Sequence, residues 1–136
     1  MKTALVVDDK ILIADSVAEA ITQEVSDESL NVLTTDSQKK ATQILKGKTP
    51  IDILVTDINL SNEGGDKEGG IILARLAKHI NPSSGIFIYT SHTEEEVKNM
   101  IPKESYPWVN LINKKGKQLT EHPTFLNFLK ENDITV

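Results

Sequence analysis

The chain alternates between two kinds of apolar pattern, and this alternation limits its fold more than any other feature. Short, nearly continuous apolar runs are typical of strands that are covered on both faces, and apolar residues spaced three and four apart are typical of amphipathic helices. The apolar runs predict strands over Thr3 to Val7, Asn31 to Thr35, Ile51 to Thr56, Ile86 to Tyr89 and Val109 to Ile112. A helical pattern follows each run, so we expect five strand and helix pairs.

Capping and helix-breaking residues set the expected limits of these helices. Asp36 is a candidate cap for the second helix, and Pro50 stands beyond its expected end. Thr93 and Glu96 have the spacing of a capping box at the start of the fourth helix, and Pro123 is placed to begin the last one. Strands that alternate with helices imply right-handed crossovers, so the sequence predicts an α/β fold with a doubly wound parallel sheet.

The length of 136 residues fits a single domain over 1–136, and we expect no second, output domain. The chain has no cysteine, which excludes disulfides, thiolate zinc sites and a cysteine nucleophile and fits a cytoplasmic location. No apolar run approaches the roughly 20 residues of a membrane span, and the start lacks the apolar region of a signal peptide. We therefore expect no membrane insertion.

The net charge is -5, from 15 Lys and Arg against 20 Asp and Glu. An acidic chain repels phosphate backbones and anionic lipids, so nucleic acid is not an expected direct partner. A cation or a compact charged ligand fits this balance better. The sequence thus favours a small charged ligand over a polyanion.

Polar and charged side chains stand where the predicted strands end. Ligands of doubly wound sheets bind beyond the carboxyl ends of the strands, where the strand order reverses. The residues expected at this edge are Asp8 and Asp9 after the first strand, Asp57 after the third, Thr90 after the fourth, and Lys114 with Lys115 after the fifth. Each could by itself be structural, as a helix cap, a turn residue, an ordinary strand residue or a solvated lysine.

Taken together, these residues predict a site for a cation and a phosphoryl group. Three carboxylates at one edge repel one another and raise each other's pKa unless a cation offsets them. Oxygen ligands without His or Cys suit Mg²⁺, and a lysine opposite completes a clamp for phosphoryl oxygens. An Asp carboxylate can itself attack phosphorus. We therefore expect phosphoryl chemistry with Mg²⁺ at this edge.

A glycine-rich segment from Ser61 to Gly70 separates the third strand from the third helix. Glycine-rich loops before helices can cradle phosphate, but Glu63, Asp66 and Glu68 would oppose an anion here. We therefore interpret the segment as a mobile surface loop.

Four segments together resemble the receiver domain of two-component response regulators. They are ALVVDDK, PIDILVTDINL, GIFIYTSH and LINKK, and each coincides with a strand and its carboxyl end. The resemblance covers essentially the whole chain in the right order, and it is to stand-alone receivers such as chemotaxis regulators. It implies a flavodoxin-like fold of five strand and helix pairs, with strand order 2-1-3-4-5.

The resemblance also implies a role for individual residues. Asp57 matches the residue that becomes an aspartyl phosphate, and Asp8 and Asp9 match the acidic pair that holds Mg²⁺. The implied metal ligands are Asp8, Asp9, Asp57 and the backbone carbonyl of Asn59. The implied catalytic set is Asp57, the switch hydroxyl of Thr90 and the ammonium of Lys114.

The chain departs from the family pattern at several positions. Lys115 stands where the family has proline, Leu111 where an aromatic residue is frequent, and Ser91 where alanine is usual. The loop after Asp57 is longer than usual and lacks the common proline near Ser61.

The implied function is a phosphorylation-dependent signalling switch rather than an enzyme. Its phosphoryl donor would be a phosphohistidine on a sensor histidine kinase or a histidine phosphotransfer protein, and its output would be contact with a downstream target protein. We expect the partner face on the fourth strand, the fourth helix, the fifth strand and the last helix.

Other classes of function stay open at this stage. One is a receiver-like interaction module that is never phosphorylated. Another is a Mg²⁺-dependent phosphohydrolase, which would need an acid where Asn59 stands. A third is a flavin-binding module, which Asp8 and Asp9 disfavour because they would repel a phosphate.

Overall fold

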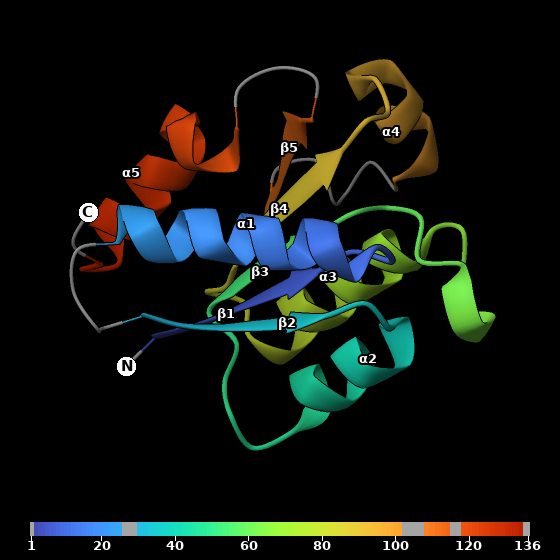
Figure 1. Cartoon of the computed structure of the whole chain (residues 1–136), viewed down its shortest axis with the longest axis horizontal. Coiled ribbons are helices and arrows are strands. Elements are labelled where there is room, and N and C mark those ends of the chain that lie inside the picture. Colours follow the sequence, from blue (N-terminus) through green and yellow to red (C-terminus); the bar gives the residue numbers. More distant parts are fainter. Residues whose placement is uncertain (1, 26–29, 102–107, 115–117, 135–136) are drawn as a thin grey trace.

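The structure, a computed structural model, describes residues 2–25, 30–101, 108–114 and 118–134. Within these ranges five strands alternate with five α-helices (Figure 1). The strands are β1 (Lys2–Val7), β2 (Leu30–Thr35), β3 (Ile53–Thr56), β4 (Gly85–Thr90) and β5 (Val109–Asn113). The helices are α1 (Ile11–Glu24), α2 (Gln38–Lys46), α3 (Gly69–Ile80), α4 (Glu94–Met100) and α5 (Pro123–Glu131), with short 3₁₀ helices η1 (Asn62–Gly64) and η3 (Leu119–Glu121).

The strands form one parallel sheet in the order β2-β1-β3-β4-β5. This confirms the predicted doubly wound, flavodoxin-like fold. The order reverses at β1, which has β2 on one side and β3 on the other. Val7 pairs with Thr56 at the ends of β1 and β3. Asp8 directly follows Val7, and Asp57 directly follows Thr56. The register therefore brings Asp8 and Asp57 to the same edge of the sheet.

Helices cover both faces of the sheet (Figure 1). On one face, α1 and α5 bury Ile21, Phe125 and Leu129 against inward-facing residues of the strands. The rings of Phe87 and Phe125 meet edge to face, with centroids 5.1 Å apart. On the other face, α2 and α3 bury Ala41, Leu45, Leu73 and Ala74, and α4 buries Val97. All four residues of β3 are buried, as expected for a central strand.

The helix starts agree with the sequence in two cases and differ in one. Thr93 and Glu96 form the predicted capping box of α4, and Pro123 occupies the first turn of α5. The cap of α2 is Ser37 rather than Asp36, since Ser37 Oγ accepts a hydrogen bond from the backbone N–H of Lys40. The prediction was wrong by one residue because both side chains are good caps and the sequence does not fix where helical geometry begins.

The glycine-rich segment is folded onto its neighbours. It contains η1, and its Asp66 exchanges two hydrogen bonds with the side chain of Gln38 on α2. The carbonyl of Asp66 also accepts from the backbone N–H of Leu60 at 3.0 Å. The segment, which the sequence predicts to be a mobile surface loop, is therefore held at Asp66 against α2 and Leu60. No described helix is long and apolar enough to cross a membrane.

Candidate functional site

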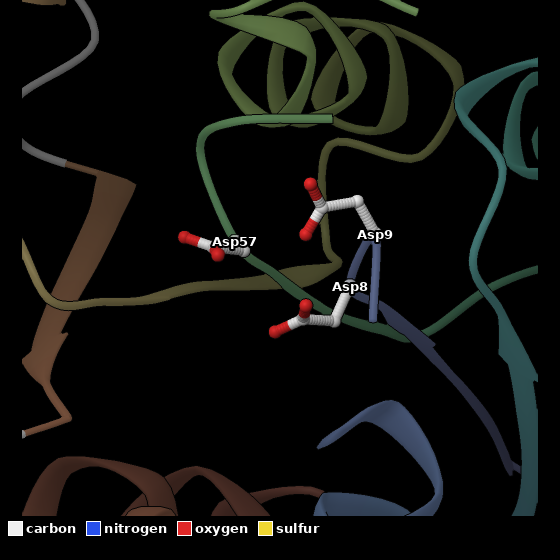
Figure 2. A group of neighbouring side chains, drawn as sticks. All are labelled: Asp8, Asp9 and Asp57. Atoms are coloured by element: carbon white, nitrogen blue, oxygen red, sulfur yellow. The ribbon is translucent and has the colours of Figure 1, made fainter. Parts of the chain in front are cut away.

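Three carboxylates meet at the carboxyl edge of β1 and β3. Asp8 and Asp9 follow β1, and Asp57 follows β3. One oxygen from each side chain lies within 4.8 Å of the others, and Figure 2 shows the three side chains grouped at this edge. Asp8 is buried and the other two are partly exposed. The set contains only hard oxygen donors in an open cluster, which is what a hydrated Mg²⁺ requires.

The backbone around Asp57 holds its side chain at the rim of the sheet. Its N–H donates to the carbonyl of Val7 at 3.0 Å, which continues the pairing of β1 and β3 past the last strand residue. Its carboxylate Oδ1 accepts from the N–H of Ile58 at 2.7 Å. The hydroxyl of Thr56 donates to the carbonyl of Asp57 at 2.8 Å. The backbone N–H, the carbonyl and the carboxylate of Asp57 are thus all held by hydrogen bonds.

A glycine allows α3 to begin against Asp57. A Cβ on Gly70 would lie 1.8 Å from the carbonyl oxygen of Asp57, which no side chain can do without moving the backbone. The N–H of Gly70 donates to the carbonyl of Ile58 at 2.9 Å. Gly70 therefore permits the close approach that joins the start of α3 to the loop after β3.

The ammonium of Lys114, just after β5, lies against the carboxylates. Its Nζ donates to Asp8 Oδ2 at 2.9 Å and to Asp57 Oδ2 at 3.1 Å. Burial alone would lower the pKa of Lys114, but its hydrogen bond to Asp8 and the charges of Asp57 and Asp8 outweigh that effect and raise the pKa. Lys114 is therefore protonated at neutral pH and offsets part of the negative charge.

One lysine does not neutralise three carboxylates, and the pKa of Asp9 reflects the remaining negative charge. Burial raises the pKa of Asp9, and the neighbouring Asp8 and Asp57 raise it further, while Lys10 has a smaller opposite effect. Asp8 has two hydrogen-bond donors, the N–H of Lys10 at 3.0 Å and Lys114 Nζ. The cluster as a whole favours binding of a further cation.

Thr90 ends β4 beside the same cluster and is 2% exposed. Its Oγ1 accepts a hydrogen bond from the N–H of His92 at 3.2 Å, which leaves its hydroxyl hydrogen available for another acceptor. The carbonyl of Thr90 accepts from the N–H of Lys114 at 2.8 Å, so the two residues are joined through their backbones. The amide of Asn113 also donates to the carbonyl of His92 at 3.2 Å.

Asn59 lies in the loop after Asp57, and its side chain is exposed. Its Oδ1 accepts from the N–H of Ser61 at 3.0 Å, which is the geometry of an Asx turn. The side chain is therefore engaged in shaping the loop. The structure thus brings Asp8, Asp57 and Lys114 into direct contact, with Asp9 in the same carboxylate cluster and Thr90 joined to Lys114 through the backbone; Asn59 is two residues after Asp57. Lys115, which replaces the family's proline, lies outside the described residues.

Two residues at this edge were not predicted from the sequence. The Asn62 amide donates to the backbone carbonyls of Asp9 at 3.0 Å and Asp36 at 3.1 Å, so the glycine-rich segment holds the loop that carries Asp9. The ring centroid of Tyr89 lies 5.7 Å from Lys114 Nζ, within the range of a cation–π contact. The only sequence signal for Asn62 is that it is an asparagine in a glycine-rich loop. The only one for Tyr89 is that it is an aromatic residue directly before Thr90.

The model of the response regulator receiver domain family matches residues 4–106 of the chain. This match spans well over half of the sequence, so the chain belongs to the response regulator receiver domain family. Receiver domains are signalling domains, and membership supports a switch based on phosphorylation. They bind Mg²⁺ at an acidic pocket, which agrees with the carboxylate cluster here.

Solved structures agree with this assignment. A response regulator receiver domain protein from Clostridium thermocellum is 18% identical, with a TM-score of 0.72 and coverage of 98% of both chains. A response regulator receiver protein from Sinorhizobium medicae WSM419 is 24% identical, with a TM-score of 0.71 and coverage of 95% of this chain and 94% of that one.

A third similar structure is a response regulator protein from Burkholderia pseudomallei with a phosphorylated aspartic acid, a calcium ion and citrate. It is 17% identical, with a TM-score of 0.62 and coverage of 97% of this chain and 73% of that one. At these identities the three structures establish the fold. No curated protein sequence matches the chain.

Proposed function

We propose that this domain is a switch in a two-component or phosphorelay pathway, in which Asp57 accepts a phosphoryl group from a phosphohistidine. The observation that carries the proposal is the contact of one ammonium, Lys114, with two carboxylates, Asp8 and Asp57, inside a cluster of three. Such an arrangement positions a nucleophile and supplies charge for phosphoryl oxygens. The calcium ion and phosphorylated aspartic acid of the Burkholderia pseudomallei protein support it by analogy.

The nucleophile is the carboxylate of Asp57. One of its oxygens forms a bond to phosphorus as the phosphorus–nitrogen bond of the donor breaks, and the imidazole leaves with the bonding electron pair and takes up a proton. The ion pair of Lys114 with Asp57 Oδ2 places the ammonium where it can contact a phosphoryl oxygen. Asp8 and Asp9, with Asp57 and the carbonyl of Asn59, would hold Mg²⁺. When bound, this ion would neutralise phosphoryl oxygens as charge shifts.

Thr90 is the residue that would pass the signal on. Its hydroxyl hydrogen is available, and an aspartyl phosphate at position 57 would offer strong acceptors with about -1.5 to -2 charge. Thr90 also lines a hollow of about 560 Å³ together with Val97 of α4 and Leu111 and Asn113 of β5. Movement of Thr90 toward the phosphate would change this hollow. The output face for a target protein is therefore proposed on α4, β5 and α5.

Incubation with acetyl phosphate and Mg²⁺ tests the proposal. The intact protein should gain the mass of one phosphoryl group, and the Asp57→Asn variant should gain none. A parent protein whose mass stays unchanged would favour the non-phosphorylated interaction module instead. The output face can be tested by NMR with the phosphoryl mimic beryllofluoride, where shift changes should extend from Asp57 through α4 and β5.

A further inference from the structure

The two helices α2 and α3 carry a charge opposite to that of the whole chain. Residues 37–51 and 69–93 contain no Asp or Glu at all. They hold six of the 15 Lys and Arg, which are Lys39, Lys40, Lys46, Lys48, Arg75 and Lys78. All 20 carboxylate side chains therefore lie elsewhere, together with the other nine cations. A chain with net charge -5 thus has two neighbouring helices, α2 and α3, that carry cations and no carboxylate.

Five of these cations form what we call the basic face, made of Lys39, Lys40, Lys46, Lys48 and Arg75. All five side chains are exposed. Among the described residues, none of the five takes part in a salt bridge. Acidic residues stand at its border: Asp36 before α2, Asp52 before β3 and Glu68 before α3, while Asp66 is hydrogen-bonded to Gln38. The positive charge of the face is therefore not neutralised within the domain.

The basic face spans α2 and α3, which lie next to each other on one side of the sheet (Figure 1). Between the ends of these helices is a hollow of about 320 Å³, lined by five apolar residues and also by Gly47, Lys48, Thr49 and Asn81. The apolar residues around it are Leu45, Pro50, Ile51, Ala77 and Ile80. Ile80 is 46% exposed, so its aliphatic side chain is accessible at this hollow. The face therefore combines unpaired cations with a place for one aliphatic side chain.

The hollow is remote from the carboxylate cluster. Ile51 comes shortly before β3, and Asn81 comes between α3 and β4, so the hollow lies at the amino edge of the sheet, opposite Asp57. The amide of Asn81 donates to the carbonyl of Ile51 at 3.1 Å, which fixes the two segments to each other. A partner on this face can bind while Asp57 stays accessible.

We propose that the basic face docks an acidic segment of a protein partner, with carboxylates opposite the lysines and one aliphatic side chain in the hollow beside Ile80. Charge complementarity supports this occupant, because exposed cations without internal partners gain most from an external acidic surface. The apolar residues of the hollow favour a protein over a nucleic acid or a lipid surface, since neither of those presents a single aliphatic side chain among anions. Docking here does not depend on phosphorylation of Asp57.

The test is an NMR titration of the folded domain with a synthetic peptide of glutamates around a central leucine. Amide shifts should change on α2, on α3 and around Ile80, equally in the parent and in Asp57→Asn. A matched peptide with glutamine in place of glutamate should cause no such changes. Binding should weaken as salt is raised, because the attraction between exposed charges is screened.

Charge reversal provides the matched variants. Lys39→Glu with Lys46→Glu should weaken binding of the glutamate peptide by about tenfold or more, since two attractions become two repulsions. Lys130→Glu makes a reversal on the exposed surface of α5 and should leave the affinity unchanged. Equal loss in both variants, or shift changes outside α2 and α3, would overturn the proposal.

Other ligands that could bind the basic face are tested in the same experiment. A DNA duplex or vesicles of phosphatidylglycerol that bind the basic face more tightly than the peptide would overturn the choice of a protein partner. Self-association of the parent that Lys39→Glu with Lys46→Glu abolishes would assign the face to a second copy and also overturn it. Failure of Asp57 to accept phosphate would leave the peptide result unaffected.

Discussion

Lys114 Nζ lies 3.1 Å from Asp57 Oδ2, although the two residues are 57 positions apart in the sequence. The contact joins the ends of β3 and β5, with β4 between them. The same ammonium also reaches Asp8, 106 positions away, at 2.9 Å. This one side chain therefore connects three segments of the carboxyl edge, and it is where a phosphoryl group on Asp57 would find positive charge.

Removal of this ammonium should slow phosphorylation without preventing folding. Lys114→Met is expected to lower the rate of phosphorylation by acetyl phosphate by roughly a hundredfold, which is typical for the loss of one preorganised donor. The rate can be followed by intact-mass measurement over time. Lys130→Met, an exposed lysine on α5, is the control and should react like the parent. Equal rates for Lys114→Met and the parent would show that the ammonium has no part in the transfer.

Mg²⁺ should stabilise the folded domain through the carboxylate cluster. At about 100 times its dissociation constant, an ion that binds only the folded state raises the free energy of unfolding by roughly 2.7 kcal/mol. Urea unfolding with Mg²⁺ and with EDTA measures this gain. Asp8→Asn should abolish most of it, while Asp52→Asn, at the opposite edge of the sheet, should retain it. A gain that persists in Asp8→Asn would place the ion elsewhere.

Asp9 should make the metal-free domain less stable as the pH rises. Because its pKa is raised in the folded state, the folded protein holds a proton that the unfolded chain loses between the ordinary pKa and the raised one. The free energy of unfolding therefore falls as the pH rises through this window. In EDTA, Asp9→Asn should gain up to about 1 kcal/mol at neutral pH, a small value because solvent screens the group.

This gain from Asp9→Asn should disappear as the pH falls below the ordinary pKa of Asp, near 3.9, because both proteins are then uncharged at position 9. Urea unfolding at a series of pH values compares the parent with the variant. A gain that is independent of pH would mean that crowding of charge is not its cause. Excess Mg²⁺ should reverse the sign, since the variant loses a metal ligand.

Asn62 should support the metal site from the glycine-rich segment. Asn62→Ala removes two hydrogen bonds that hold the carbonyls of Asp9 and Asp36, so we expect a loss of roughly 1–2 kcal/mol in the free energy of unfolding. The affinity for Mg²⁺, measured by calorimetry, should fall severalfold. Asn132→Ala also removes an amide hydrogen bond, to Phe128 at the end of α5, and should leave the Mg²⁺ affinity unchanged. Equal affinities in Asn62→Ala and the parent would contradict this role.

Much of the fold could be predicted from the sequence because parallel strands have a clear pattern. The fully buried β3 appears as an apolar run, and Asp8, Asp57 and Lys114 directly follow strands while Thr90 ends one. Once the strand order is known, the edge on which Asp8, Asp57, Thr90 and Lys114 meet is determined. The capping box at Thr93 is equally local, since its two partners are three residues apart.

The features that were missed depend on contacts between distant segments. Asn62 bonds to residues 53 and 26 positions away, and no periodicity records such a pair. Gln38 and Asp66 are likewise 28 positions apart, and their contacts turn the expected mobile loop into a pinned one. The sequence does not distinguish Asp36 from Ser37 as the cap of α2, because aspartate and serine are both good caps.

Chemical mapping of the acyl phosphate identifies the residue that carries the phosphoryl group, which we propose is Asp57. Borohydride reduces an aspartyl phosphate to homoserine, so the protein can be phosphorylated with acetyl phosphate and Mg²⁺, reduced, digested and sequenced by mass spectrometry. The proposed function predicts homoserine at position 57 and retention of aspartate at positions 8 and 9. Homoserine at position 8 or 9, or at no position, would contradict it.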